Sequence, residues 1–382
     1  MVNNRHCDEY WFVAYFYIFL LLKPIISIVP QYSTIILLIS VVLVLIMKLL
    51  TSTVVIQKNF ILFLVITLFF GVSLLWGKAV NHYSAVDQYI IDFVIYGVIP
   101  LFIMSGKMDY SKVLAFISRF SLIATVVIFA DPFMEYQFTG GYMEYGFNML
   151  TYSFAGIILN YYYFEKKWCR WLILVDLVLI TVYGNKGAVV AALILFFVAS
   201  NLKERMIAKK FVVYVAAFGG IIFWKQILSA FVSVADKYVT GSYSINTLKI
   251  LLSDTSMITN SRTNIWEKAV DVIKSNPLGV GVGYFENYYD GYTHNVELDI
   301  AVMFGIIGLI LFILLLIMAV RNIVLIDDRP KQVFLIGSLI CWFVPMQFSL
   351  TIWNVIVFWI FWGSTFFVSI GSIQPSNIDE QL

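Results

Sequence analysis

Histidine and cysteine are scarce in this 382-residue chain, which has three of each, and charged residues make up only 13% of it. The cysteines Cys7, Cys169 and Cys341 stand far apart, and neither a disulfide framework nor a CxxC metal site is indicated. The histidines are scattered and the carboxylates do not cluster, so the ligand set of a metal site is lacking. We therefore expect a protein without a metal ion or another cofactor.

Apolar residues dominate the composition instead. They make up 61% of the chain, against about 45–50% in ordinary soluble domains, and the mean hydropathy is +0.89. A water-soluble core cannot hide so much apolar surface, so we predict an all-α, polytopic integral membrane protein. The first apolar run, 11–30, is longer than the core of a signal peptide, and no small-residue cleavage site follows it. We expect it to be retained as a span.

Membrane-spanning helices need roughly 20 predominantly apolar residues, and about 12 segments of the chain meet this requirement. The predicted spans are 11–30, 32–50, 59–76, 88–104, 112–131, 146–164, 168–184, 187–201, 210–228, 296–320, 332–350 and 352–371. The eighth is short, and the last two are separated by so little that they form either a hairpin or a broken helix. Three regions follow: nine spans in 1–228, a large polar loop in 229–295, and three spans with a tail in 296–382.

The distribution of Lys and Arg predicts the orientation, because positive residues in short loops resist translocation. With the N-terminus inside, the short outer loops hold only Lys78 and Lys186. The inner loops and their flanks hold Lys48, Lys58, Lys107, Lys112, Lys166, Lys167, Arg170, Lys203, Arg205, Lys209, Lys210, Arg321, Arg329 and Lys331. We therefore expect both termini to be cytoplasmic and the loop 229–295 to lie outside.

The outer loop contains "TNIWEKAVDVIKSNP", which is typical of an amphipathic helix lying along the outer surface. Helical spacing places charged residues opposite the apolar ones, and Asn276-Pro277 ends the pattern. A side chain at Asn260, Ser261 or Thr263 would cap the start. The predicted apolar face consists of Ile265, Trp266, Ala269, Val270 and Ile273.

The glycine-rich "GVGVG" that follows this helix invites comparison with a phosphate-binding loop. Such a loop follows a strand and opens a helix within a βαβ unit, and neither flank of Gly279, Gly281 and Gly283 has that context. We interpret the glycines as a tight turn on the outer surface.

His294 lies at the outer edge of the span that begins at residue 296. Its unperturbed pKa of about 6.5 suits a general base or a diphosphate ligand. The alternative is an interfacial imidazole that hydrogen-bonds a neighbouring carbonyl. If a helix starts near the histidine, Glu297 falls three residues further on the same face and would orient the ring.

Cations from three other parts of the chain are predicted to reach the same membrane face: Lys186, Lys225 and Arg262. Each is either a solvated surface charge or part of an anion site. A cluster of this kind suits a diphosphate, because Arg binds phosphate bidentately and Lys acts as a point charge. Asp92, about one turn below this face, is a further candidate for the outer site.

Two further expectations concern residues within or beside the spans. Arg119 and Asp176 lie at similar depths in different spans, which favours a structural ion pair. Tyrosines gather near the outer loops, Tyr292 among them, and either belong to the membrane interface or stack on sugar rings.

The run "SRTNIWEKAVDVIKSNPLGVGVGYF", followed by "THNVELDIAVMFGIIGLILF", resembles the O-antigen ligase/polymerase superfamily. Its members carry an Arg and then a Trp in the outer loop, followed by NPxGxG, by HN and by a span that opens with a Gly-x-x-Gly turn. The matching residues are Arg262, Trp266, Asn276-Pro277, Gly279, Gly281, His294-Asn295, Gly305 and Gly308. "YGNKGAVVAALILFF" is similar to the family's SRG hairpin, with Lys186 in place of the usual Arg, which keeps the charge but loses the bidentate fork.

The resemblance implies a glycosyltransferase that uses a polyprenyl-diphosphate-linked glycan at the periplasmic face of the bacterial inner membrane, without a metal or a nucleotide sugar. Arg262 and Lys186, together with Lys225, would hold the diphosphate. His294 would act as base toward the acceptor hydroxyl or as a further phosphate ligand. Other substrate contacts are expected from Asn295, Glu297, Tyr292 and Asp92.

Two activities occur in the superfamily, and the resemblance favours the first of them. A polymerase joins repeat units that are linked to undecaprenyl diphosphate, whereas a ligase transfers the finished glycan to lipid A-core. The Lys at 186 is a departure that we expect more readily in polymerases. For a polymerase, the resemblance also implies a chain-length regulator as partner, and no nucleic acid. A flippase for lipid-linked sugars is the alternative of another class, but it would place its charges along a central cavity.

Overall fold

The computed structural model describes residues 8–51, 58–82, 85–106, 108–136, 138, 141–203, 224–238, 245–246, 248–249, 252 and 256–367. Throughout these residues the regular structure is helical and no strand is found, which confirms the all-α prediction. Five helices are long and apolar enough to cross a membrane: Asp8–Ile26, Asn59–Asn81, Val86–Met104, Tyr110–Met134 and Val296–Leu325.

The first half of the chain forms helices that follow the predicted spans closely. They are α1 (Asp8–Ile28), α2 (Ser33–Thr51), α3 (Lys58–Asn81), α4 (Ala85–Asp92), α5 (Ile99–Met104), α6 (Tyr110–Ala130), α7 (Tyr142–Asn148), α8 (Ala155–Tyr162), α9 (Cys169–Tyr183) and α10 (Lys186–Lys203). Short π-helical segments join α4 to α5 and α7 to α8, so each of these pairs is one continuous rod. Apolar side chains on the outside of this bundle, such as Leu68 and Val126, are exposed, as expected of a surface that faces lipid.

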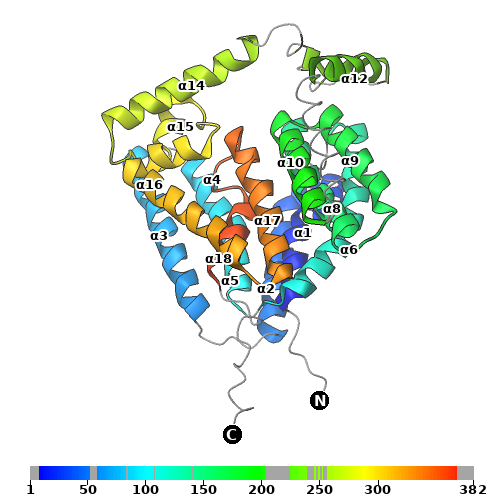
Figure 1. Ribbon diagram of the computed structural model, residues 1–382. Coiled ribbons are helices and arrows are strands. Elements are labelled where there is room, and N and C mark those ends of the chain that lie inside the picture. The colour runs from blue at the N-terminus through cyan, green and yellow to red at the C-terminus, as the bar shows by residue number, and fades with distance from the viewer. Residues whose placement is uncertain are drawn as a thin grey trace.

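The second half differs more from the predicted spans. Its helices are α12 (Trp224–Tyr238), α14 (Ser256–Ser275), α15 (Tyr284–Tyr289), α16 (Val296–Leu325), α17 (Arg329–Phe343) and α18 (Ile356–Phe366). Figure 1 shows α12 and α14 lying across one end of the bundle, which we call the α14 end. Most of the predicted span 210–228 lies outside the described residues, and its last part belongs to α12.

The last two predicted spans form a hairpin, because α17 and α18 pack against each other. Neither is a full-length helix. Residues 344–355 between them are irregular, apart from a short 3-10 turn at Pro345–Gln347, where the sequence predicted almost continuous helix. This irregular stretch is buried at several points by neighbouring helices, with Trp353 fully enclosed. Non-helical backbone inside a membrane protein is tolerated where protein covers it or where it lines a site.

Helix α16 is interrupted at Gly305, and the glycine-rich loop closes the gap. Gly305 takes φ 72°, which breaks the helical hydrogen-bond ladder. The loop supplies replacement partners: Val280 N donates to Val302 O at 2.9 Å, Gly281 N to Met303 O at 3.1 Å, and Ile306 N to Pro277 O at 2.9 Å. The glycines therefore form a backbone splint for α16. The glycines do form a turn, as predicted, but this turn is packed against the backbone of α16.

This close approach explains why glycine is required on both sides. Gly279 has φ +88°, and a Cβ there would lie 2.5 Å from Gly305 N. A Cβ at Gly305 would in turn run into the backbone of Leu278. The loop is also fastened to α3, since Asn81 Nδ2 donates to Val282 O at 2.8 Å.

Helix α14 packs on protein through part of its predicted apolar face. Ala269 of that face and Val272, which the prediction left out, are buried against Phe285 of α15 and Val302 of α16. Trp266 and Val270, predicted to belong to that face, are 37% and 38% exposed. The helix starts at Ser256, so the proposed capping residues 260–263 lie inside it, while the predicted end before Asn276 is correct.

The predicted ion pair between Arg119 and Asp176 is wrong. Arg119 is exposed on α6, and Asp176 is fully buried on α9, where its Oδ2 accepts a hydrogen bond from Ser153 Oγ at 2.8 Å. Similar depth in two spans did not place the two side chains on facing sides of their helices. A buried ion pair is found elsewhere, between Lys48 Nζ and Asp8 Oδ1 at 2.8 Å.

Candidate functional site

His294 sits in a short loop that joins α15 to α16 at the α14 end of the bundle. Its backbone is left-handed, with φ 56°. Helix α16 begins two residues later, and Asn295 caps it by accepting a hydrogen bond from Leu298 N at 3.0 Å. The histidine therefore stands directly before a helix N-terminus, where the unpaired N–H groups favour negative charge.

Helix α14 fixes the position of this loop from the other side. Trp266 Nε1 donates to the carbonyl oxygen of Thr293 at 3.0 Å. Thr293 is fully buried, and its hydroxyl donates to Asn295 O at 2.8 Å, with Asp299 Oδ1 also in reach at 3.2 Å. The Trp of the family pattern thus holds the backbone of the residue next to the histidine.

The irregular stretch between α17 and α18 forms a third side of the site. Tyr292 Oη and Ser349 Oγ are 2.7 Å apart, and Asn295 Nδ2 donates to Gln347 Oε1 at 3.1 Å. Gln347 Nε2 in turn donates to Glu297 Oε1 at 2.9 Å. Glu297 therefore binds Gln347, and the expectation that it orients the His294 ring fails, because the helix starts after the histidine.

Lys186 is the first residue of α10, in the hairpin that joins it to α9. Asn185 caps this helix by accepting a hydrogen bond from Ala188 N at 2.9 Å, and its Nδ2 donates to Met143 O at 2.8 Å. Gly187 lies against Phe348, since a Cβ at Gly187 would be 3.3 Å from the phenylalanine Cβ. The segment that binds the His294 loop therefore also touches the Lys186 hairpin.

The charge of Arg262 on α14 acts on both of these residues. Burial lowers the pKa of His294, and the nearby Arg262 guanidinium lowers it further. The pKa of Lys186 is lowered by the same two causes in the same order. Lys186 on α10 and His294 in the loop before α16 thus each lie within electrostatic reach of Arg262 on α14. Together with two helix N-termini, they form a site that suits an anion.

The His294 ring is held and partly covered. The Tyr292 ring centroid lies 4.2 Å from that of His294, at an interplanar angle of 44°. Nδ1 is buried and has no hydrogen-bond partner within the described part of the chain, which leaves Nε2 as the accessible nitrogen. The lowered pKa means that the imidazole is neutral at pH 7, the state that accepts a proton.

The remaining predicted site residues are Asp92 and Lys225. Asp92 accepts a hydrogen bond from Gln88, one turn earlier in α4, at 2.8 Å. Lys225 belongs to α12, and its side chain lies outside the described residues. Lys78, the other predicted outer cation, is paired with Asp87. The roles assigned to Asp92 and Lys225 stay predictions.

Sequence reasoning missed the residues that support the site. Asn185 carries the usual signal of a helix cap, an Asn just before an apolar helical run, so its role could have been predicted from the sequence. Gln347 and Ser349 carry no such signal, because they fall inside a stretch that is apolar enough to be taken as helix. Their importance appears only when the chain places them beside residues more than 50 positions away.

Comparison with known proteins supplies one match. Residues 171–313, which include Lys186, Arg262 and His294, match the model of a protein family described as O-antigen ligase. The resemblance to the O-antigen ligase/polymerase superfamily is confirmed. The match supports the O-antigen polymerase or ligase class and does not separate the two. No curated protein and no solved structure matches the chain.

The apolar helices indicate a membrane protein, and the family match covers the part of the chain that holds the candidate site. The matched region runs from α9 to the first part of α16, so it contains both helix N-termini that border the site.

Proposed function

We propose that this protein is an O-antigen polymerase, which joins oligosaccharide repeat units carried on undecaprenyl diphosphate at the periplasmic face of the membrane. The observation that carries the proposal is the meeting of Lys186, Arg262 and His294 in front of two helix N-termini. Two side-chain cations and two helix N-termini supply positive potential, and His294 supplies a neutral imidazole. This combination suits a reaction that releases a diphosphate and deprotonates a hydroxyl.

The diphosphate is the leaving group, and its charge grows as the glycosidic bond to the carrier breaks. The Arg262 guanidinium binds one phosphate with its fork of donors, and Lys186 adds a point charge on the other side. The N-terminal N–H groups of α10 and α16 stabilise the same charge. Such preorganised donors cost no rearrangement at the moment of reaction.

His294 serves the acceptor. Its neutral imidazole removes the proton from the attacking hydroxyl of the other repeat unit through Nε2. Arg262 keeps the imidazole neutral until the diphosphate arrives, because two cations side by side repel each other. Tyr292 covers one face of the ring and offers an aromatic surface on which a sugar can stack.

The polymerase is preferred to the flippase because the basic residues of the site gather at one end of the bundle. A flippase needs charged groups along a path from one membrane face to the other. A pocket in the described part of the bundle is lined mostly by apolar side chains, and none of the three site residues lines it.

Deletion of the gene in its own host tests the proposal and separates it from ligase activity. We expect lipopolysaccharide with core plus a single repeat unit on a gel, and a restored ladder when the full-length protein is supplied. Bare core in the deletion strain would contradict the proposal, because a ligase or a failure of export leaves the core without any repeat. An unchanged ladder would exclude both superfamily activities.

A further inference from the structure

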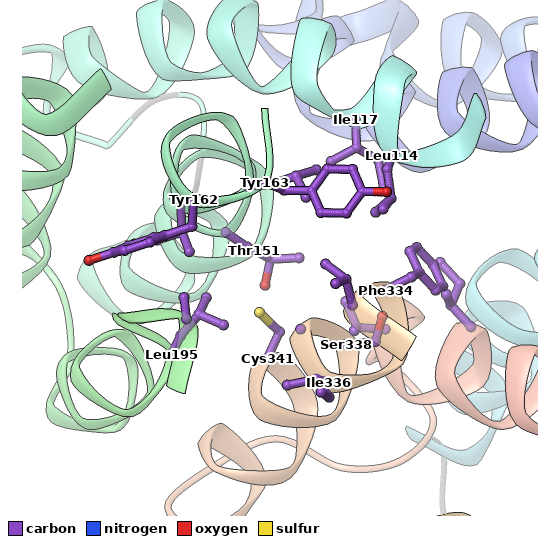
Figure 2. A pocket seen from close by; sticks show the side chains of 18 of the residues that line it. Leu114, Ile117, Thr151, Tyr162, Tyr163, Leu195, Phe334, Ile336, Ser338 and Cys341 are labelled. Atoms are coloured by element: carbon purple, nitrogen blue, oxygen red, sulfur yellow. The ribbon is translucent and has the colours of Figure 1, made fainter. Parts of the chain in front are cut away.

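An apolar pocket of about 200 Å³ lies inside the bundle, away from the site described above. It is lined by α1, α6, α8, α10, α17 and α18, and Figure 2 shows Ile117, Thr151, Tyr163, Leu195 and Cys341 arranged around it. A cavity of about 150 Å³ with such a lining accepts a benzene molecule, so this one has room for a larger apolar group.

The pocket is elongated along α17. Its lining includes Arg329, the first residue of that helix, and Cys341, twelve positions later. At 1.5 Å per residue this separation is roughly 18 Å, and half of the hydrocarbon thickness of a bilayer is roughly 15 Å. The pocket therefore reaches from one membrane face to about the middle of the membrane.

Arg329 marks the face at which the pocket begins. Helix α16 starts beside His294 and runs for 30 residues, and Arg329 follows four residues after its end. The pocket thus starts at the end opposite His294. Arg329 is exposed, and its hydrogen bond to Gln332 uses one of the five donors of the guanidinium. The neighbouring Asp328 carboxylate is engaged as the cap of α17, where it accepts a hydrogen bond from Lys331 N at 3.2 Å.

We propose that this pocket binds one acyl chain of a phospholipid from the leaflet on the Arg329 side, with the lipid phosphate on Arg329. An apolar slot of half-bilayer depth with a guanidinium at its rim matches the order of groups in a phospholipid. In the orientation predicted from the Lys and Arg distribution, this is the cytoplasmic leaflet. The tail of a polyprenyl carrier is the less suitable occupant, because its diphosphate would lie at Arg262, at the other end of the molecule.

Gly337 offers a way to fill the pocket without disturbing its walls. It lines the pocket on α17, and a Cβ added there meets no atom within 4 Å. Gly337→Phe places a phenyl ring in the space, and it replaces a poor helix former with a better one. Gly71→Phe on α3 is the matched control, because a Cβ at Gly71 also meets nothing within 4 Å and Gly71 does not line the pocket.

The test uses the full-length protein, purified in detergent, and phosphatidylglycerol with a diazirine in its acyl chain. After illumination, we expect labelled peptides from α8, α10 and α17. Gly337→Phe should largely abolish this labelling, because the phenyl ring occupies the space that the acyl chain needs. Gly71→Phe should be labelled like the wild type, and Arg329→Gln should be labelled less.

Two results would overturn the proposal. One is labelling of these helices that persists in Gly337→Phe while the protein keeps its wild-type melting behaviour. The other is loss of labelling when polyprenyl phosphate is added in equal amount, which would assign the pocket to a carrier tail. The assay needs no catalytic turnover, so its outcome is independent of the proposed polymerase activity.

Discussion

At the scale of single residues, the chemistry depends on how Arg262 and His294 influence each other. Burial and the guanidinium both disfavour the imidazolium form, so His294 enters the reaction able to accept a proton. The ordinary pKa of the group is 6.5, and the folded value lies below it. Activity that needs the neutral ring is present above this folded pKa and is lost as the pH falls through it.

Arg262→Gln should therefore do two things at once. It should slow the reaction, because a diphosphate ligand is lost. It should also move the acidic limb of the rate profile to higher pH, toward 6.5, because one of the two causes of the lowered His294 pKa is removed. Rates measured in proteoliposomes with a lipid-linked donor between about pH 5 and 8 would show both effects.

Lys274→Gln is the matched control for that experiment. Lys274 lies on the same helix, its side chain is 73% exposed, and it pairs with Asp271 rather than with the site. Loss of the Lys274 charge should leave the acidic limb of the rate profile at the same pH as in the wild type. An Arg262→Gln enzyme that is slower but has an unshifted limb would show that Arg262 does not control the protonation of His294.

At the scale of elements, the broken helix α16 and its glycine-rich splint hold the His294 loop in place. Gly279→Ala should destabilise the protein by at least about 2 kcal/mol, because the left-handed backbone and the contact with Gly305 both reject a Cβ. We expect a lower apparent Tm in detergent. Gly291→Ala, in an open loop where a Cβ meets nothing within 4 Å, should change stability by less than about 0.5 kcal/mol. Equal melting of the two variants would contradict the splint.

Elements also show how far the sequence can be interpreted. Lys186, Arg262 and His294 were predicted to share one membrane face because successive spans alternate in direction, a property that apolar runs and charge counts reveal. Hydropathy does not reveal the break at Gly305, since "MFGIIGLILF" is apolar on both sides of it, and only the family pattern implied a Gly-x-x-Gly turn there. The prediction of helix for residues 344–355 was wrong for the same reason: apolar composition does not distinguish a buried irregular segment from a helix.

Errors of detail came from geometry that hydropathy does not contain. Glu297 was placed beside His294 by helical spacing, but the left-handed backbone at His294 puts the histidine outside the helix. Arg119 and Asp176 were paired by depth alone, although the two side chains point in different directions around their helices. Contacts such as that between Asn295 and Gln347 depend on packing across the fold and follow from no local pattern.

At the scale of the whole molecule, the bundle has two chemically different ends. The α14 end carries the cluster of Lys186, Arg262 and His294, and the opposite end carries Lys48, Lys166, Arg329 and Lys331. The count of positive residues predicts that the second end is cytoplasmic.

Cysteine labelling would test that orientation, and the native cysteines number only three, so they are readily removed. Tyr288→Cys lies at the α14 end, where Tyr288 is 64% exposed, and Asp327→Cys lies in the exposed turn before α17. A membrane-impermeant maleimide should label Tyr288→Cys in spheroplasts and should label Asp327→Cys only after lysis. The reverse pattern would place the site on the cytoplasmic side and exclude a periplasmic reaction.

The central claim is that His294 is the base of a glycosyl transfer, and one substitution tests it most directly. His294→Asn keeps a residue that tolerates left-handed backbone, so it removes the base with little strain. His82→Asn is the matched control, since His82 is exposed, has φ 51° and lies within the predicted outer loop, directly after α3. At matched membrane abundance, His294→Asn should lower the rate of chain extension about 10²–10⁴-fold and His82→Asn should leave it unchanged. Normal extension by His294→Asn would contradict the account.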